Sequence, residues 1–366
     1  MNRSNVSRPT RLDPPVPRPL LSGVIVNYNS WPDVAALVAS LGSSPEVVSG
    51  SCEVVVVDNA SAGPAPEALK PPGHGVRLVT LRDNGGFAVG VNAGWRESNA
   101  PWLILLNPDV AAADGWLSRV VERVRGYERD AAPAPGVVGY ALRNPDGSRQ
   151  PSVGRFPNLG RAVWEQLIPR SRRKYQAVWR TKEGPADWVT GACVLVNARL
   201  LEALGGLDEE FFLYYEEVAL CRSARRQGWR VEYDPSVEVV HLRPLQNRGV
   251  TPRLRVITRH SKLLYFRKHL PRWQYLGLSA VVAAEARLRG AWAGFRGREE
   301  DARSWRTVAR VERELRAGAS LGGRAVLALA DSVVEPDTSN GPAPTTLVRP
   351  TPATRAEPHD RTRRGA

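Results

Sequence analysis

Short apolar runs alternate with helix-length amphipathic stretches along the first part of the chain. Four runs are rich in Val, Leu and Ile: LSGVIVN, CEVVVVD, GVRLVTL and WLILLN. Strands of a parallel sheet are buried on both faces, so they read as nearly continuous apolar segments followed by covering helices. The pattern over 21–130 therefore predicts an α/β fold with a mostly parallel sheet and helices near 32–41 and 114–127.

The pattern weakens over 131–188 and returns at 187–206, where a strand runs into a helix. A helix is expected at 215–227, ending before a glycine, and a closing strand at 230–241. Pro and Arg enrichment predicts a disordered arm at 1–20 and a mostly disordered tail at 321–366. Between them, 246–320 is expected to form a basic helical C-terminal region.

Charge separates the body of the chain from the segment that follows it. The 366 residues carry 51 Lys+Arg and 37 Asp+Glu, for a net charge of +14. Residues 21–240 hold 23 basic and 25 acidic side chains, whereas 241–320 hold 18 and 6. A neutral body followed by a basic segment indicates an anionic partner for that segment. No nucleic-acid partner is expected, because the segment contains no known reader motif.

The basic segment also contains interleaved aromatic residues. Its longest uncharged stretch, 273–284, is about half of the roughly 20 residues that a membrane span requires. We expect a cytoplasmic protein bound peripherally to the anionic inner face of the plasma membrane. The alternative is an ordinary solvated helical face. The aromatic residues are Trp273, Tyr275, Trp292, Phe295 and Trp305.

The cysteine pattern excludes two classes of small, stapled protein. The three cysteines are far apart in the sequence and form no C-x-x-C pair. A disulfide framework and a structural zinc site are therefore not expected, and the cysteine usage fits a protein in a reducing compartment.

Polar residues follow three of the predicted strands, at 27–29, 58–59 and 107–109. In an open α/β sheet, ligands bind beyond the carboxyl ends of the strands. Each group alone could be a cap or a turn, but three at one edge favour a binding site. Asn107 and Asp109 are suited to a hard divalent cation that arrives with phosphate oxygens.

Three further features have both a structural and a functional interpretation. The glycine-rich loop at 84–94 does not match the dinucleotide or Walker patterns; it serves either a phosphate or tight helix packing. Glu216 and Glu217 follow an aromatic patch and are either helix-dipole complements or a general base. His241 ends an apolar strand and is either an edge histidine or a metal ligand.

Taken together, VIVNYNS, VVVVDNAS, NGGFAVGVNAGW, LLNPD, WVTGACVLV, GGLDEEFFLYYEE and VVH resemble the inverting family 2 glycosyltransferases. The rhamnosyltransferase-type branch is the most similar, and the resemblance spans roughly 21–270. It implies a GT-A glycosyltransferase domain, a Rossmann-like sheet, over 21–245. Its nucleotide-binding half would be 21–130 and its acceptor-binding half 131–245.

The resemblance also implies roles for particular residues. Asp109 would hold Mg²⁺ or Mn²⁺ on the donor diphosphate, and His241 would complete the metal site. Tyr28 and Asp58 would meet the nucleobase and ribose, and Gly191 and Ala192 would lie near the transferred sugar. The full donor-binding set is Tyr28, Asp58, Asn84, Gly86, Asn92, Asn107, Gly191 and Ala192.

The catalytic base implied by the resemblance is Glu217, with Glu216 beside it. Relatives carry a later aspartate where this chain has Ala219. The expected reaction is metal-dependent transfer, best matched by L-rhamnose from dTDP-rhamnose, to a cell-envelope glycan or a polyprenyl-diphosphate-linked acceptor. Alternatives are another donor, such as UDP-galactofuranose or a hexose nucleotide, or a non-catalytic nucleotide-sugar-binding protein. The sequence carries no signal for oligomeric state.

Overall fold

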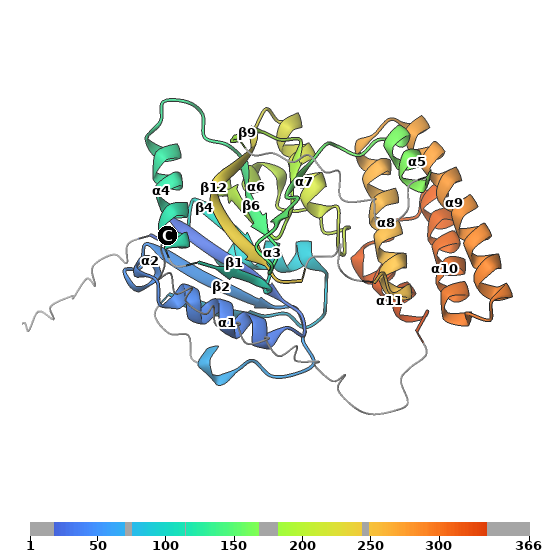
Figure 1. Ribbon diagram of the computed structural model, residues 1–366, viewed down its shortest axis with the longest axis horizontal. Helices are drawn as coiled ribbons and strands as arrows, with labels where there is room; N and C mark the ends of the chain where they lie inside the picture. The colour runs from blue at the N-terminus through green and yellow to red at the C-terminus, as the bar shows by residue number, and fades with distance from the viewer. Residues whose placement is uncertain (1–17, 70–74, 114, 168–181, 244–248, 335–366) are drawn as a thin grey trace, which may run out of the picture. The chain divides into compact units, whose positions relative to one another are not determined.

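A computed structural model describes residues 18–69, 75–113, 115–167, 182–243 and 249–334. Its centre is a mixed sheet in which neighbouring strands follow the order β3-β2-β1-β4-β11-β6-β12-β5 (Figure 1). These strands are β1 (Leu21–Asn27), β2 (Cys52–Asp58), β3 (Val76–Thr80), β4 (Trp102–Leu106), β5 (Val110–Ala112), β6 (Val137–Arg143), β11 (Cys193–Asn197) and β12 (Val231–His241). The fold expected from the sequence is confirmed.

The parallel part of the sheet is formed by the apolar runs. Strand β1 lies between β2 and β4 and is parallel to both, with Asn27 opposite Asp58. Strand β11 is antiparallel to β4 and β6, whereas β12 is parallel to β6. Every residue of β1, β4 and β11 is buried, which explains their unbroken apolar sequence.

Helices cover both faces of this sheet. The first face carries α1 (Trp31–Gly42), α2 (Pro45–Val48) and α4 (Trp116–Arg129), and the second carries α3 (Phe87–Glu97), α6 (Ala198–Leu204) and α7 (Glu216–Arg226) (Figure 1). Helix α3 approaches β1 closely, because a Cβ on Gly90 would lie 2.5 Å from Val26 and one on Gly94 2.5 Å from Val24. Two glycines of the loop at 84–94 therefore serve tight helix packing.

The weakly patterned middle of the chain contributes short elements at the rim of the sheet. They are β7 (Arg149–Gln150), β8 (Val153–Gly154), α5 (Leu159–Leu167), β9 (Gly184–Pro185) and β10 (Trp188–Val189), and a 3₁₀ turn, η1 (Glu67–Leu69), lies earlier in the chain. Strand β7 pairs with β6 and so brings Gln150 to the sheet.

Four helices follow the sheet: α8 (Pro252–His269), α9 (Arg272–Phe295), α10 (Glu299–Arg316) and α11 (Gly323–Asp331). They share one core with α3, α6 and α7. The tail was expected to begin at 321, but α11 lies within that range, and its residues Val326 and Ala330 are fully buried. The remaining tail and the arm at 1–17 lie outside the described residues. None of the described helices is long and apolar enough to cross a membrane.

Two of the five aromatic residues expected at a membrane surface lie in the core instead. Tyr275 and Trp305 are buried on the inner sides of α9 and α10. Trp305 lies under the guanidinium groups of Arg255 and Arg259. Composition does not show which side of a helix a residue occupies. The positions of Tyr275 and Trp305 along their helices place both rings on the buried side.

Candidate active site

The polar ends of β1 and β2 form one hydrogen-bonded group. The Asn27 amide donates to Asp58 Oδ1 at 3.3 Å and to the Ser61 hydroxyl at 3.0 Å. The backbone N–H of Ser61 donates to the same Asp58 oxygen at 3.2 Å. Tyr28 is exposed next to this group. Asp58 is therefore held in place at the strand end, as a residue that receives a nucleoside would need to be.

The loop before α3 is held by Asn59. Its amide donates to Asn84 Oδ1 and to the Gly86 carbonyl, both at 3.0 Å. Gly86 has φ of +94°, and a Cβ there would lie 2.3 Å from the Phe212 carbonyl oxygen. Gly86 is thus required by the close approach of two backbone segments. Its neighbour Phe87 donates its N–H to that same carbonyl at 2.8 Å.

Asp109 and His241 are brought together by the pairing of β5 with β12. His241 Nε2 lies 3.4 Å from Asp109 Oδ1, and both side chains are largely buried. The Leu242 N–H donates to the Asp109 carbonyl at 2.9 Å. The other ring nitrogen of His241 is 3.0 Å from the Gln150 amide nitrogen. A cation binds an unprotonated ring nitrogen, so a metal ligand at Nε2 requires the tautomer in which Nδ1–H donates to the Gln150 side-chain oxygen, with that amide turned accordingly.

This pair fits a divalent cation that is shared with a diphosphate. A carboxylate oxygen and an imidazole nitrogen suit Mn²⁺ or Mg²⁺, and the hydrogen bond to Gln150 is the kind of support that orients a histidine ligand. Within the described residues, no group of three or more His, Cys, Asp or Glu side chains could hold a metal. The remaining ligands would have to come from the donor and water.

Glu216 and Glu217 begin α7 immediately after a strained turn. Tyr214 and Tyr215 have φ of +66° and +71°, which is costly for aromatic residues. The turn is held by α8, where the Ser261 hydroxyl donates to the Leu213 carbonyl at 2.8 Å. Such strain, held by surrounding structure, is typical of functional sites.

Glu216 is buried and Glu217 is partly buried. Burial raises the pKa of Glu217 to about 7, and burial together with the neighbouring Glu217 charge raises the pKa of Glu216 well above 4.5. Among the described residues, one oxygen of each carboxyl lacks a hydrogen-bond partner. A carboxyl group with a pKa near neutrality is suited to accept a proton from a hydroxyl group.

The backbone at 191–192 connects the two parts of the site. A Cβ on Gly191 would lie 3.6 Å from Glu217 Cβ, so this glycine directly faces the carboxylate helix. The next residue, Ala192, accepts a hydrogen bond from the Asn107 N–H at 3.0 Å. The segment 191–192 therefore contacts both the start of α7 and the strand end that precedes Asp109.

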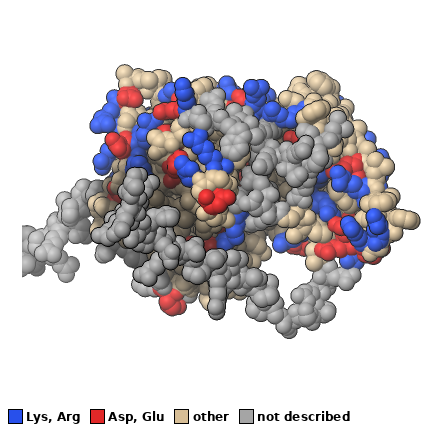
Figure 2. Space-filling model, viewed as in Figure 1, with Lys and Arg blue, Asp and Glu red and all other residues tan. Residues whose placement is uncertain are grey.

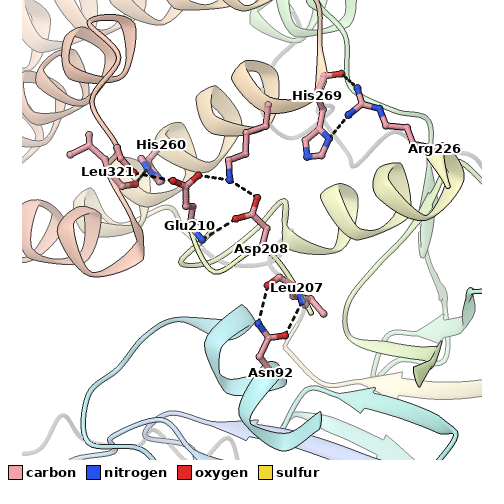
Figure 3. Close-up of polar contacts among 10 residues, drawn as sticks. Asn92, Leu207, Asp208, Glu210, Arg226, His260, His269 and Leu321 are labelled. Carbon is pink, nitrogen blue, oxygen red and sulfur yellow. Dashed lines mark hydrogen bonds and ion pairs between the residues drawn. The ribbon is translucent and has the colours of Figure 1, made fainter. Parts of the chain in front are cut away.

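The Asn92 side chain is engaged in hydrogen bonds within the protein. Its amide donates to the Leu207 carbonyl at 2.9 Å and to Glu209 at 2.8 Å, and the Leu207 N–H donates back at 2.8 Å (Figure 3). With both amide hydrogens taken, Asn92 fixes the loop that precedes the aromatic patch. The same loop is tied to α8, since Lys268 lies 2.6 Å from Asp208 and also pairs with Glu210.

Ala219 lies at a cavity on α7. The cavity has a volume of about 360 Å³ and also borders Leu204, Asp208, Ser223 and His269. Ala219 is buried, and the backbone N–H of this residue continues the helix by bonding to the Tyr215 carbonyl. The short side chain of Ala219 thus borders this open space.

Several supporting residues had no signal in the sequence. Gln150 belongs to a two-residue strand far from His241 in the chain, and Ser61 contacts Asn27 through its hydroxyl and Asp58 through its backbone N–H. Arg243, whose Nε lies 3.9 Å from Asp109 Oδ2, also pairs with Asp33 at the start of α1. For Arg243, the only signal in the sequence is its position two residues after His241.

The chain is similar to known glycosyltransferases. The model of Glycosyl transferase family 2 matches residues 22–205. An N-acetylglucosaminyl-diphospho-decaprenol L-rhamnosyltransferase from Mycobacterium tuberculosis is 29% identical over 61% of this chain and 76% of its own length. A low-salt glycan biosynthesis hexosyltransferase from Haloferax volcanii is 26% identical over 72% and 82%.

A solved mannosyltransferase from Pyrobaculum calidifontis, in complex with GDP-Man and Mn²⁺, aligns over 87% of both chains with 19% identity and a TM-score of 0.47. The family model covers half of this chain, and its span includes both Asp109 and the segment at 191–192. The chain belongs to glycosyl transferase family 2.

Proposed function

We propose that the chain transfers L-rhamnose from dTDP-rhamnose to a hydroxyl group of a polyprenyl-diphosphate-linked glycan acceptor, with inversion at the anomeric carbon. Family membership supports a glycosyltransferase. The sugar and the class of acceptor are supported by the Mycobacterium tuberculosis relative, whose name specifies both. A second relative, from Escherichia coli, is also named a rhamnosyltransferase and is 22% identical over 45% of this chain.

One observation supports the proposal: the segment 191–192 contacts both the helix that carries Glu217 and the strand end that leads to Asp109. Gly191 lies against Glu217, and Ala192 is bonded to the strand end that leads to Asp109. The transferred sugar would occupy the space beside Gly191, where the absence of a side chain leaves room. Asp58 and Tyr28 would hold the nucleoside, and Asn84 would border the donor from the loop before α3.

Glu217 acts as the general base in this proposal. An acceptor hydroxyl is a poor nucleophile at neutral pH. Its proton therefore passes to a Glu217 carboxylate oxygen while the hydroxyl oxygen attacks the anomeric carbon. The bond between that carbon and the nucleoside diphosphate breaks in the same step. Attack from the side opposite the leaving group inverts the configuration.

Asp109 and His241 would hold Mg²⁺ or Mn²⁺ on the donor diphosphate, with Asn107 beside them. When bound, such a cation neutralises negative charge on the leaving group. The chain's own contribution is to orient the His241 ring through Gln150 and to hold the main chain at Asp109 through the backbone N–H of Leu242. Asn92 and Gly86 support the donor pocket by holding its loops.

A thermal-shift screen of nucleotide sugars with Mn²⁺ tests the choice of donor, because a bound ligand stabilises the native state by mass action. The proposal expects the largest shift with dTDP-rhamnose. A clear preference for a uridine nucleotide would favour the alternative of a galactofuranosyl or hexosyl donor. The Haloferax volcanii relative, named a hexosyltransferase, is the observation that keeps this alternative open.

A further inference from the structure

Helix α9 exposes an apolar surface along its outer side. Trp273, Leu288, Trp292 and Phe295 are 65%, 73%, 57% and 82% exposed, and Leu276 is also exposed. At about 100° per residue, these five positions fall within about 160° of the helix circumference. The opposite side, with Tyr275, Leu278 and Val282, is buried. The exposed stripe thus lies on a helix whose opposite side is already packed against the rest of the protein.

A third exposed tryptophan lies on a helix that packs against α9. Trp164 of α5 is exposed, and the Leu159 N–H of the same helix donates to the Gln274 side chain of α9 at 3.0 Å. Leu159 also fills the space over Gly277, where a Cβ would lie 2.5 Å from it. Seven of the eleven large apolar residues exposed in the described structure therefore belong to α9 and its neighbour α5.

Basic side chains accompany this apolar surface. Arg272, Arg287 and Arg296 are exposed at its two ends and within it. The Arg296 guanidinium lies 4.8 Å from the Trp292 ring centre, and Trp292 stacks on Phe295 at 5.9 Å. Figure 2 shows Lys and Arg side chains over the C-terminal helices, next to uncharged surface. The sequence from 241 to 320, with 18 basic and 6 acidic residues, makes this part of the chain strongly cationic.

We propose that the outer side of α9, with Trp164 of α5 beside it, docks the enzyme on an anionic lipid bilayer. Exposed Trp and Phe rings are suited to the interface between headgroups and acyl chains, and arginine side chains pair with anionic headgroups. A second copy of the chain would bring the same arginines face to face. The choice of a bilayer as occupant rests on the proposed function, in which the acceptor is anchored by a polyprenyl chain.

The docking surface is structurally connected to the site. Helix α8 packs against α9 through the shared core, and it also holds Leu213 through Ser261. Tyr265 of α8 lies 5.5 Å from Tyr215, ring centre to ring centre. The residues that precede Glu216 and Glu217 are thus supported by α8, which packs against the helix that carries the docking surface.

Sedimentation of the full chain with vesicles tests this inference. The vesicles contain either phosphatidylcholine alone or phosphatidylcholine with phosphatidylglycerol. We expect binding to the anionic vesicles at low salt and release at high salt, because exposed charge interactions are screened. The triple variant Trp273→Gln, Trp292→Gln, Phe295→Gln is expected to lower the partition coefficient by at least about tenfold. Arg272→Gln, Arg287→Gln, Arg296→Gln is expected to do the same.

A matched control removes the same charge elsewhere. Arg82, Arg129 and Arg199 are exposed on the α/β body, and their joint replacement by Gln is expected to leave binding within about twofold of wild type. Equal binding to neutral vesicles, insensitivity to salt, or an equal loss in the control would overturn the inference. So would absence of binding, or a dimer in solution that the aromatic triple variant dissolves.

The outcome is separable from that of the proposed function. Turnover of dTDP-rhamnose with a water-soluble acceptor that lacks the polyprenyl chain is expected to be unchanged in both triple variants. Wild-type protein that binds anionic vesicles but turns over no nucleotide sugar would contradict the proposed function alone. An active enzyme that ignores vesicles would contradict the docking surface alone.

Discussion

His241 Nε2 and Asp109 Oδ1 lie 3.4 Å apart at the end of the β5–β12 ladder. The ladder pairs His241 with Val110, so its register brings the imidazole next to the carboxylate. A one-residue slip of β12 would turn the imidazole to the other face of the sheet. The pair is therefore a product of the fold and not of a local sequence motif.

Replacing Asp109 tests the assignment of this pair. Asp109→Asn keeps the size of the side chain but removes its charge, so we expect Mn²⁺-dependent transfer to fall by at least about 100-fold. Asp130→Asn, at an exposed aspartate that follows α4, is the control and is expected to be neutral. Initial rates over a Mn²⁺ titration give the comparison. Wild-type activity and metal response in Asp109→Asn would show that 107–109 is not the diphosphate site.

Gln150 provides a test that does not depend on turnover. Gln150→Leu removes the hydrogen bond to His241 Nδ1 and leaves the imidazole free to rotate. Loss of such a supporting contact weakens metal binding by about 10- to 100-fold, which calorimetric titration of Mn²⁺ with nucleoside diphosphate measures. Gln227→Leu, at an exposed glutamine after α7, is the matched control. Unchanged Mn²⁺ affinity in Gln150→Leu would mean that His241 is not a ligand.

The two adjacent carboxyl groups predict how stability depends on pH. Because burial raises the pKa of Glu216, the folded protein holds its proton more tightly than the unfolded chain. This contribution to stability is present at low pH and is lost as pH rises through the folded-state pKa. Glu216→Gln has no carboxyl group to ionise and so lacks this loss of stability. Its melting temperature is expected to exceed that of wild type at pH 8 by about 2 °C or more. A smaller difference is expected at pH 5, and calorimetry at both pH values decides.

Two glycines assigned to the donor pocket are expected to behave differently. At Gly86 an alanine would meet the Phe212 backbone at positive φ, so Gly86→Ala is expected to lower the free energy of unfolding by about 3 kcal/mol. At Gly191 a Cβ fits at 3.6 Å from Glu217 but occupies the space left for the sugar. Gly191→Ala is expected to fold normally and to raise KM for the donor. Equal stability losses in denaturant titrations would contradict this distinction.

The sequence predicted the parallel sheet and the positions of Asp58 and Asp109 because apolar runs end where the buried strands end. It left His241 open until the resemblance was considered, since the pairing of β5 with β12 joins residues far apart in the chain. Gln150 could not be found, because β7 has only two residues and no hydrophobic period. Such sites depend on register, which local patterns do not encode.

Other residues have surroundings that the sequence did not indicate. The resemblance implied that Asn92 lines the donor pocket, which stays a prediction; its amide is engaged by Leu207 and Glu209. Tyr275 and Trp305 were grouped with exposed aromatics by composition, but the helical phase buries them. The tail was started too early because α11 is short and is stabilised by burial of Val326 and Ala330.

The most direct test of the central claim is the stereochemistry of transfer by wild type and Glu217→Gln. Purified protein is incubated with dTDP-rhamnose, Mn²⁺ and an N-acetylglucosaminyl-diphospho-prenol acceptor, and the product anomer is identified by NMR. We expect one glycoside of inverted configuration per nucleoside diphosphate released. Glu217→Gln should be slower by about 10²–10⁴-fold with donor affinity unchanged. Release of no nucleoside diphosphate from any nucleotide sugar, retention of configuration, or full activity of Glu217→Gln would contradict the account.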